Sequence, residues 1–444
     1  MITLEGLLQQ VEAAEEEIVE LERALVRFPT VNTGRMPTGN ETPLAQFLAG
    51  KLGEESISAQ VVESAPGRGN LIARVSGSEG SPSLLYMAHS DVVPVEDESA
   101  WRYPPFEATV AEGRVWGRGT NDCKALVTCE TMATILLKRA GVPLKGDLIL
   151  ATAADEETGG KYGYGWLAQN MPHAIRADFA VNEGGGLPVK TAKGLLFLFP
   201  HGEKGRLEVQ ITLRGKGFHA ASPWRGVNPI FALGEVLRRI QEYEPGRDVS
   251  APIFRHLGLF DIKEEVTVEN VDAIADRVTL EQNEAFGSKL RGLSRMTLTP
   301  TIVSGGIKSN QIPNRCHLIC DVRTLPHQGE EYVRGEIEKL LEGMEGIEKM
   351  ALDYTAAPSS SPYDTPFAQE VKRATQVALG REDLIWVPCL TTGFTDSRLV
   401  RPMGTIVYNF APSHPDADPD RAGAHCVDES VDIASLVTST KMLV

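Results

Sequence analysis

Two histidines and several carboxylates stand where apolar segments of the sequence end. His89 closes the apolar run Leu84–Ala88, and Asp91 follows two residues later. An imidazole at a strand end can bind a metal ion, and a carboxylate or carbonyl then usually accepts a hydrogen bond from its second ring nitrogen. Asp91 is close enough in the sequence to do so. The alternative is a histidine that only completes the hydrogen bonding at the end of a strand.

A glycine-rich turn precedes Asp122. Within Trp116–Lys124 the sequence Gly-Arg-Gly lets the backbone bend sharply before a helix expected over Cys123–Arg139. Asp122 could therefore be a helix N-cap. A cap would explain the aspartate but not the tight turn or the adjacent Lys124. A carboxylate with two oxygens can instead bridge two cations about 3.5 to 4 Å apart.

Three adjacent acids, Asp155, Glu156 and Glu157, follow the apolar segment Leu148–Ala153. Carboxylates this close repel one another unless a cation lies among them, and a metal ion supplies one. If Glu157 faces the metal, Glu156 can lie beside the attacking water as a general base. The alternative is a solvated acidic loop.

Glu183 and His425 are weaker candidates taken singly. Glu183 precedes three glycines, which often mark only a turn, and His425 could simply precede the last helix. With His89, Asp122 and Glu157, however, they complete a set of nitrogen and oxygen donors that suits zinc, cobalt or manganese.

The elements that position these residues are short apolar strands and intervening helices. Strands are expected over Leu71–Val75, Leu84–Ala88 and Leu148–Ala153, with the helix Cys123–Arg139 between the last two. This order predicts a layered α/β domain, which carries its sites at the carboxyl ends of strands. Residues 3–28 are expected to form one amphipathic helix.

The pattern changes near Lys204 and predicts a second, α+β unit. Its expected elements are the strand Arg206–Arg214, the helix Pro229–Tyr243, the extended runs Met296–Val303 and Cys316–Asp321, and the helix Glu330–Glu345. The segment Pro245–Arg295 has mixed periodicity and cannot be assigned. Because the strands Leu384–Val387 and Thr405–Tyr408 resume the first pattern, we expect one domain over 1–198 and 358–444 and an inserted domain over 199–357.

Composition limits the partners and the location. A formal charge of −16 over 444 residues disfavours a nucleic-acid or anionic-membrane partner. The six cysteines are scattered, as in a protein with reduced thiols. The N-terminus is acidic, unlike a signal peptide, and no apolar run has the ~18 residues of a membrane span, so we expect a cytoplasmic protein.

Five motifs occur in an order that resembles the dinuclear zinc aminoacylase and carboxypeptidase family. That family includes acetylornithine deacetylase, succinyl-diaminopimelate desuccinylase, glutamate carboxypeptidases and carnosine-type dipeptidases. The motifs are H-x-D-V-V-P from His89, G-R-G-x-x-D-x-K from Gly117, D-E-E-x-G-G from Asp155, the acid and glycines from Glu183, and G-x-H-x-x-x-E from Gly423.

The resemblance implies a three-layer αβα catalytic domain with a mixed sheet and an inserted α+β domain that serves as lid and dimerisation domain. It also implies two zinc ions per chain, with cobalt or manganese as alternatives. By this resemblance the metal ligands are Asp122 as the bridge, His89 and Glu183 on one ion, and Glu157 and His425 on the other. Asp91 would orient His89, and Glu156 would be the general base.

The resemblance extends to three residues of the inserted domain. His219 lies in G-K-G-F-H-A-A-S-P, Asn310 in G-G-I-K-S-N-Q-I-P and Arg323 in D-V-R. The resemblance implies that His219 reaches the active site of a neighbouring subunit, which requires a homodimer, and that Asn310 and Arg323 bind substrate. These residue types suit an oxyanion and a carboxylate, although Arg323 could also be an ordinary surface residue of a strand.

The expected function is metal-dependent hydrolysis of an amide bond next to a carboxylate, in a dipeptide or an N-acyl amino acid. One alternative is a related amidohydrolase that acts on a ureido or amidino acid. A non-catalytic binding paralogue is another, but it would have no chemical reason to keep all five ligands and Glu156. A serine hydrolase is disfavoured because the sequence has no G-x-S-x-G motif.

Overall fold

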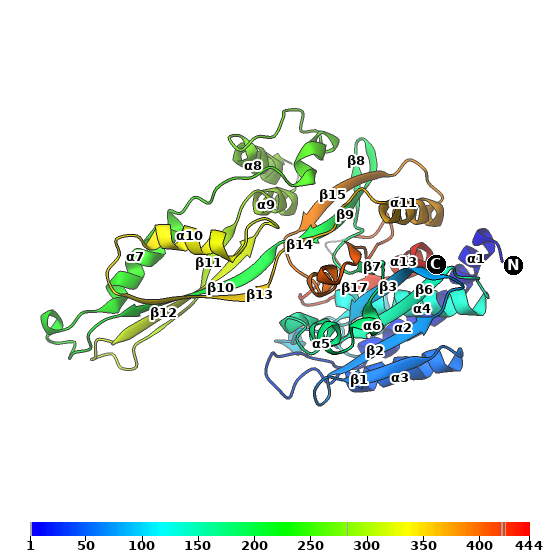
Figure 1. Ribbon diagram of the computed structural model, residues 1–444, viewed down its shortest axis with the longest axis horizontal. Coiled ribbons are helices and arrows are strands. Elements are labelled where there is room, and N and C mark those ends of the chain that lie inside the picture. The colour runs from blue at the N-terminus through cyan, green and yellow to red at the C-terminus, as the bar shows by residue number, and fades with distance from the viewer. Residues whose placement is uncertain (1, 282, 419–420, 422) are drawn as a thin grey trace. The chain divides into compact units, whose positions relative to one another are not determined.

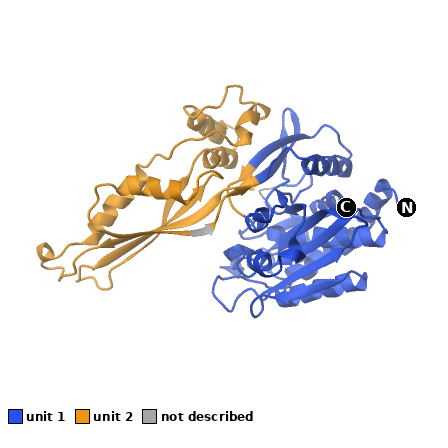
Figure 2. Ribbon diagram, viewed as in Figure 1, with its two compact units in different colours: residues 1–201, 361–389, 395–444 blue, residues 202–360, 390–394 orange. Residues whose placement is uncertain are grey.

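The computed structural model describes residues 2–281, 283–418, 421 and 423–444. The chain forms two compact units, which Figure 2 shows in different colours. Unit 1 comprises residues 1–201, 361–389 and 395–444, and unit 2 comprises residues 202–360 and 390–394. Unit 2 is therefore an insertion into unit 1, completed by a short segment that returns to it later in the chain.

A six-stranded mixed sheet lies at the centre of unit 1 (Figure 1), with the strand order β1-β2-β6-β3-β7-β16. The strands are β1 (Ala59–Glu63), β2 (Gly69–Val75), β3 (Gly80–His89), β6 (Gly146–Ala153), β7 (Phe179–Asn182) and β16 (Ile406–Asn409). Strands β6, β3, β7 and β16 run parallel, whereas β1 and β2 join by antiparallel pairings. The mixed sheet expected from the sequence is confirmed.

Helices cover both faces of this sheet, and the alternation of side chains along β3 shows why. Tyr86 and Ala88 point into one apolar core, and Leu85 and Met87 point into the other. The first core packs against α1 (Leu4–Ala13), α2 (Glu15–Val26), α3 (Thr42–Glu54), α4 (Ala125–Arg139), α11 (Pro366–Leu379) and α13 (Ile433–Leu443). The second packs against α5 (Tyr164–Asn170), α6 (Pro172–Ile175) and α12 (Ser397–Val400). The three-layer arrangement is confirmed.

The expectation of a single helix over residues 3–28 is wrong. The helix is interrupted at Ala14, which has φ −91° and ψ 7° and separates α1 from α2. The three acids Glu15, Glu16 and Glu17 then occupy the first turn of α2, where negative charge is favourable next to unpaired backbone N–H groups. The apolar spacing continues through the break, so the periodicity alone did not reveal it.

Two small sheets, which include strands of unit 1, lie outside the central sheet. One has the order β17-β5-β4 and consists of β4 (Thr109–Ala111), β5 (Arg114–Trp116) and β17 (Ser430–Asp432). The other has the order β14-β9-β15, with β8 paired to β9, and consists of β8 (Pro188–Thr191), β9 (Gly194–Glu203), β14 (Ser359–Ser360) and β15 (Ile385–Thr391). The pairing of β17 with β5 brings the C-terminal region to the turn that follows β5.

Unit 2 is built on a four-stranded antiparallel sheet with the order β11-β12-β10-β13. Its strands are β10 (Gly205–Arg214), β11 (Thr297–Gly305), β12 (Arg315–Thr324) and β13 (Ile347–Ala356). Helices α7 (Pro229–Gln241) and α10 (Glu330–Leu341) pack on this sheet around a common apolar core. The segment that the sequence left unassigned forms a 3-10 helix (Pro252–Phe260), α8 (Val271–Glu281) and α9 (Glu284–Leu293).

Within the part of the chain that the structure describes, no helix is both long enough and apolar enough to cross a membrane.

Candidate metal centre

Three parallel neighbouring strands bring candidate residues to one edge of the sheet in unit 1. His89 is the last residue of β3, Glu156 and Glu157 follow β6 in a short 3-10 turn, and Glu183 follows β7. Because β6, β3 and β7 are adjacent and parallel, their carboxyl ends lie side by side. The topology thus places residues that are far apart in the sequence around one site.

Asp122 is presented by an irregular turn rather than by a helix end. It lies in the turn Thr120–Lys124 with φ −126° and ψ 93°, and its peptide bond to Cys123 is cis. Helix α4 has Lys124, not Asp122, at its N-cap position, so the N-cap alternative for Asp122 is wrong. Gly119 has φ +85°, and a Cβ there would meet Val92 Cγ1 at 2.4 Å, so the close approach of this turn requires glycine.

The two oxygens of Asp122 face two separate pairs of side chains. Oδ1 lies 3.1 Å from His89 Nε2, which is itself 3.5 Å from Glu183 Oε2. Oδ2 lies 3.1 Å from His425 Nε2, which is itself 3.2 Å from Glu157 Oε2. Each oxygen of Asp122 therefore faces one pair of side chains, and each pair consists of an imidazole and a carboxylate.

The donor chemistry of this cluster fits a pair of divalent cations. Burial raises the pKa of Glu183 to about 7 and also raises the pKa of Glu157. Hydrogen bonds with Asp122 and Glu157 raise the pKa of His425 to about 10. The carboxylates thus crowd negative charge that cations would offset. Two imidazoles and three carboxylates suit zinc, cobalt or manganese.

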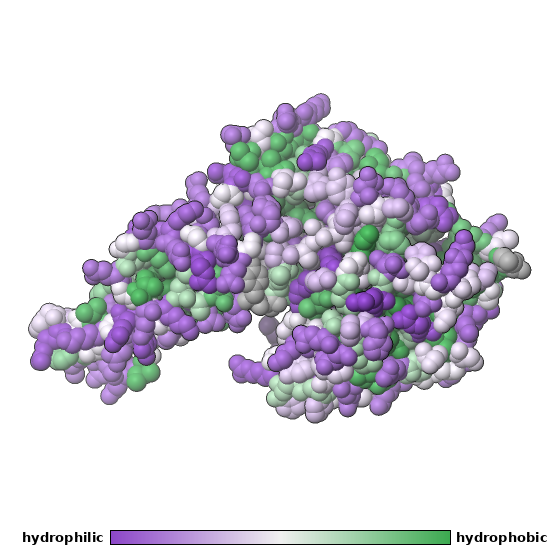
Figure 3. Space-filling model, viewed as in Figure 1, coloured by the Kyte–Doolittle hydropathy of each residue, from purple (hydrophilic) through white to green (hydrophobic). Residues whose placement is uncertain are grey.

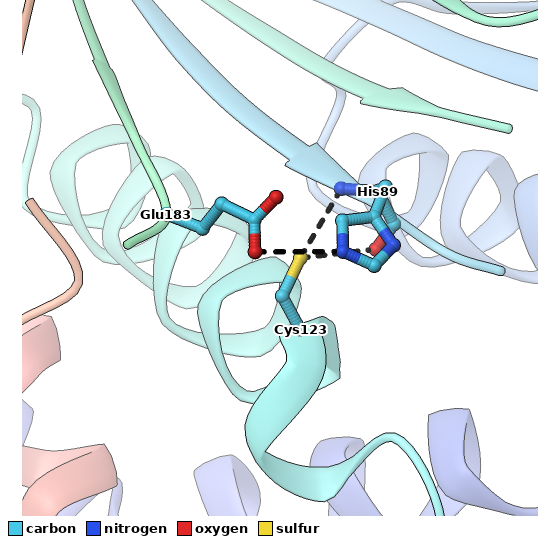
Figure 4. Close-up of side chains that lie close together, drawn as sticks. All are labelled: His89, Cys123 and Glu183. Atoms are coloured by element: carbon cyan, nitrogen blue, oxygen red, sulfur yellow. Dashed lines mark hydrogen bonds and ion pairs between the residues drawn. The ribbon is translucent and has the colours of Figure 1, made fainter. Parts of the chain in front are cut away.

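Cys123 also lies among these side chains, as Figure 4 shows. Its Sγ, the ring of His89 and a carboxylate oxygen of Glu183 come within 4.8 Å of one another. Burial raises the pKa of this thiol, and Sγ donates a hydrogen bond to the backbone carbonyl of His89 at 3.4 Å. A metal ligand must be a thiolate, which this environment disfavours. The contacts of Cys123 are those of a packed thiol beside the candidate ligands.

Asp91 links His89 to the acidic turn after β6. The Nδ1 atom of His89 lies 3.0 Å from the backbone oxygen of Asp91 and 3.5 Å from Asp91 Oδ1. The carboxylate of Asp91 accepts the backbone N–H groups of Glu156 and Glu157, at 3.0 and 3.2 Å. Asp91 is fully buried, so these contacts are shielded from water.

Glu156 is buried beside the ligand cluster. Burial raises its pKa well above the usual value, and the charge of Glu183 raises it further. His425 lies on the more open side of the cluster, because its side chain is 53% exposed whereas that of His89 is 1% exposed. The cluster in unit 1 is therefore in contact with solvent at His425.

The structure adds residues to which the sequence had assigned no role. Glu429 is buried and accepts hydrogen bonds from the turn that carries Asp122. Asn32 and Arg68 lie far upstream in the sequence and contact the acidic turn after β6. Glu429 is the last residue of the motif G-x-H-x-x-x-E, so the motif could have indicated a role for it. Asn32 and Arg68 lie in no motif, and their proximity follows only from the fold.

The three candidate residues of the inserted domain lie in unit 2, in two places. His219 and Asn310 are exposed and lie on paired loops, where the backbone N–H of Ala220 donates to the carbonyl of Asn310 at 2.9 Å. Arg323 lies on β12, donates from Nε to Asp321 Oδ1 at 2.8 Å and has its guanidinium 5.7 Å from the ring centre of Phe394. The structure thus groups His219 with Asn310 and places Arg323 elsewhere.

Comparison with known proteins decides the family. Residues 85–444 match the pattern of the peptidase family M20/M25/M40. The chain belongs to this family. The family resemblance expected from the sequence is confirmed, and with it metal-dependent hydrolysis of an amide bond.

Relatives of this M20 protein cover most of its length. A protein named probable succinyl-diaminopimelate desuccinylase, from Staphylococcus epidermidis, is 25% identical over 364 residues, which are 81% of this chain and 81% of the relative. The M20 family metallo-carboxypeptidase Sso-CP2 from Sulfolobus solfataricus has a TM-score of 0.73 at 18% identity and covers 96% of this chain and 97% of its own. The di-peptidase Dug1p from Saccharomyces cerevisiae has a TM-score of 0.73 at 17% identity. The match covers 99% of this chain and 97% of the chain of Dug1p.

Proposed function

We propose that this M20 protein is a dinuclear zinc hydrolase that cleaves the amide bond of a dipeptide or an N-acyl amino acid next to a carboxylate. The observation that carries the proposal is the position of Asp122. One of its oxygens faces His89 and Glu183, and the other faces His425 and Glu157. A bridging carboxylate with one imidazole and one carboxylate on each side is a ligand set for two ions. Cobalt or manganese would suit the same donors.

Bound metal ions would polarise the substrate carbonyl and make water a better nucleophile near neutral pH. Glu156 accepts a proton from the attacking water and later delivers it to the leaving amine. Its burial supports this role, because burial raises the pKa of this carboxyl group and so makes the carboxylate a stronger proton acceptor. Asp91 holds the backbone on which Glu156 and Glu157 lie and keeps the second nitrogen of His89 engaged.

The residues of unit 2 support a substrate that carries a carboxylate. Arg323 offers a planar guanidinium that can bind a carboxylate through two hydrogen bonds. Asn310 and His219 supply an amide and an imidazole that can donate to a developing oxyanion. Relatives named as a desuccinylase, a metallo-carboxypeptidase and a di-peptidase support the same substrate class, since each name implies an amide with a nearby carboxylate.

The register of the unit 2 sheet supports a homodimer. On β10, Arg206 lies opposite Arg323 and Arg214 lies opposite Arg315. The distance from Arg206 to Arg214 along β10 is roughly 27 Å at about 3.4 Å per residue. Arg323 lies at the Arg206 end of this strand, and His219 follows the Arg214 end. His219 and Arg323 of one chain are too far apart to hold the same small substrate. A second subunit would supply the missing His219.

The surface of unit 2 is consistent with such a partner. Strand β11 is an edge strand, and its outer residues are exposed. Figure 3 shows apolar side chains, in green, on the part of the surface over α7 and β12. The large apolar side chains exposed on unit 2 include Trp224 and Phe231, each 80% exposed, and Ile307, 94% exposed. An exposed edge strand and exposed apolar side chains on the same unit favour association with a second copy.

We place the protein in the cytoplasm, without a nucleic-acid partner. The net charge of −16 supports the absence of a nucleic-acid partner, because it repels polyanions at a distance. Recovery of the tagged protein in the soluble cytosolic fraction, without bound nucleic acid, is the expected result. Recovery with membranes or in the medium would contradict the assignment.

The test is release of free amine from a panel of dipeptides and N-acyl amino acids. The protein is assayed as purified, after chelation, and after addition of zinc, cobalt or manganese. Cleavage that is lost on chelation and restored by metal is the expected result. Release of ammonia from a ureido or amidino acid, with no cleavage of the panel, would favour the related amidohydrolases. A protein that binds no metal would contradict the proposal.

A further inference from the structure

Asn32 lies between two of the loops that carry candidate metal ligands, although it lies outside the matched residues 85–444. Its side-chain nitrogen lies 2.8 Å from Asp91 Oδ2, 3.2 Å from Asp155 Oδ1 and 3.0 Å from Thr158 Oγ1. Asn32 is 3% exposed, so water does not compete for these contacts. One amide group thereby joins the loop after β3 to the turn after β6.

Backbone pairing holds Asn32 in this place. The N–H of Asn32 donates to the carbonyl of Val92 at 2.8 Å, and the N–H of Val92 donates to the carbonyl of Thr30 at 3.0 Å. The hydroxyl of Thr30 also donates to the carbonyl of Ser90, at 2.5 Å. Residues 30–32 are therefore bound directly to the loop that follows His89, which fixes the backbone that carries the side chain of Asn32.

A buried arginine stabilises the other end of the contact. Arg68 is fully buried, and its Nη2 lies 3.0 Å from Asp155 Oδ1 and 2.8 Å from Glu41 Oε1. Asp155 has φ +73°, an uncommon conformation for a residue other than glycine, and it therefore needs outside support. Arg68 and Asn32 provide that support, because both contact Oδ1 of Asp155.

We propose that Asn32 is a positioning residue for Glu156 and Glu157. It donates to Asp91, and the carboxylate of Asp91 accepts the backbone N–H groups of both glutamates. This inference rests on the proposed function, in which Glu156 is the general base and Glu157 a metal ligand. It extends that function to a residue that touches neither the substrate nor the metal ions.

The chemistry of the site requires a neutral donor at position 32. Asp91 and Asp155 are both buried carboxylates, and an amide has two N–H groups with which to serve them. An aspartate in this position would keep the shape of Asn32 but would offer acceptors and a negative charge to two other carboxylates. An alanine would remove the donors without adding charge.

The experiment compares Asn32→Asp, Asn32→Ala and Leu48→Ala. Leu48 is a fully buried core residue of α3 and serves as the control for a general loss of stability. For each variant, kcat, KM, the dissociation constant for zinc of the chelated protein, the thermal midpoint and hydrogen exchange of the amides in residues 154–159 are measured. Three of these readouts, the dissociation constant for zinc, the thermal midpoint and hydrogen exchange, do not depend on turnover.

In both Asn32 variants we expect kcat to fall roughly 10- to 100-fold with little change in KM. We also expect faster hydrogen exchange of residues 154–159. Both effects should be larger for Asn32→Asp than for Asn32→Ala. Leu48→Ala is expected to lower the thermal midpoint and leave these readouts near wild type. If Asn32→Asp does not fold, Asn32→Ala is compared with Leu48→Ala. For a similar decrease in thermal midpoint, Asn32→Ala should then show the larger loss of kcat and the faster exchange of residues 154–159.

Two outcomes overturn the inference. One is that both Asn32 variants keep the kcat, zinc affinity and amide protection of the wild type. The other is that Asn32→Ala is at least as damaging as Asn32→Asp, because a packing role depends on shape and not on charge. Failure of the proposed function is seen separately, as the absence of metal-dependent cleavage in the wild type.

Discussion

The carboxylate of Glu429 accepts the backbone N–H of Asp122 at 3.0 Å. The same carboxylate accepts the N–H of Asn121 at 2.9 Å, the N–H of Gly119 at 3.0 Å and a guanidinium N–H of Arg118 at 2.6 Å. Glu429 stands four residues after His425 in the sequence. One buried carboxylate therefore joins the loop of His425 to the turn that presents Asp122.

Replacement of Glu429 by glutamine is expected to weaken metal binding. The amide nitrogen cannot accept a hydrogen bond, so at least one backbone N–H of the turn loses its partner. We expect the affinity of the chelated protein for zinc to fall roughly 10- to 100-fold, with a stability loss of about 1.5 to 3 kcal/mol. A competition titration with a chromogenic chelator measures the affinity. An unchanged affinity would show that the turn does not depend on Glu429.

Adjacent substitutions separate the base from the ligand. Glu156→Gln is expected to lower kcat by about 10²- to 10⁴-fold and to leave the bound metal unchanged, because it removes only a proton acceptor. Glu157→Gln is expected to lower the metal content, because Glu157 lies 3.2 Å from His425 in the second ligand pair. Elemental analysis and steady-state kinetics of the two variants provide the comparison. Near-normal turnover of Glu156→Gln would rule out Glu156 as the base.

The buried Glu22 is expected to make stability depend on pH. Burial raises its pKa from 4.5 to about 8, with Lys124 opposing and Glu429 adding to the shift. Between these two values the folded protein binds more protons than the unfolded chain, so its stability falls as pH rises from 4.5 to about 8.

Glu22→Gln should remove this loss. As pH rises from 4.5 to about 8, the unfolding free energy of Glu22→Gln minus that of the wild type should increase by up to about 1.4 kcal/mol per pKa unit. Above about pH 8 the difference should stay constant. Urea unfolding of both proteins at about pH 5 and about pH 9 measures the difference. A difference that is the same at both pH values would mean that Glu22 titrates normally.

Mixed dimers test whether His219 acts on the neighbouring subunit. Glu156→Gln and His219→Ala are each expected to be poor catalysts as pure proteins. In a mixed dimer, one site has the intact Glu156 of one subunit and the intact His219 of the other, so activity should return. Activity after joint unfolding and refolding of the two variants is the measurement. If the mixture is no more active than its components, His219 acts within its own chain or not at all.

Strand ends and local motifs made the core of the candidate site predictable. His89 is the last residue of a strand, Glu157 and Glu183 come shortly after two others, and parallel strands bring such ends together. For Asp122 the sequence allows both an N-cap and a bridge, because the residue lies directly before an expected helix. The structure decides against the cap, since Lys124 occupies the N-cap position of α4.

Residues that act through long-range contacts were not predictable. Asn32 and Arg68 precede the acidic turn by more than 80 positions, and no local pattern connects them to it. The break at Ala14 was missed because the apolar spacing runs through it. The segment 245–295 lacks a single period because it contains a 3-10 helix and two short helices, each with its own buried face.

Crystals of the protein soaked in zinc, with diffraction data collected on both sides of the zinc absorption edge, provide the most direct measurement. We expect two anomalous peaks per chain, one on each side of Asp122, one beside His89 and Glu183 and the other beside His425 and Glu157. A single peak, a peak centred on Cys123, or none at these residues would contradict the dinuclear site.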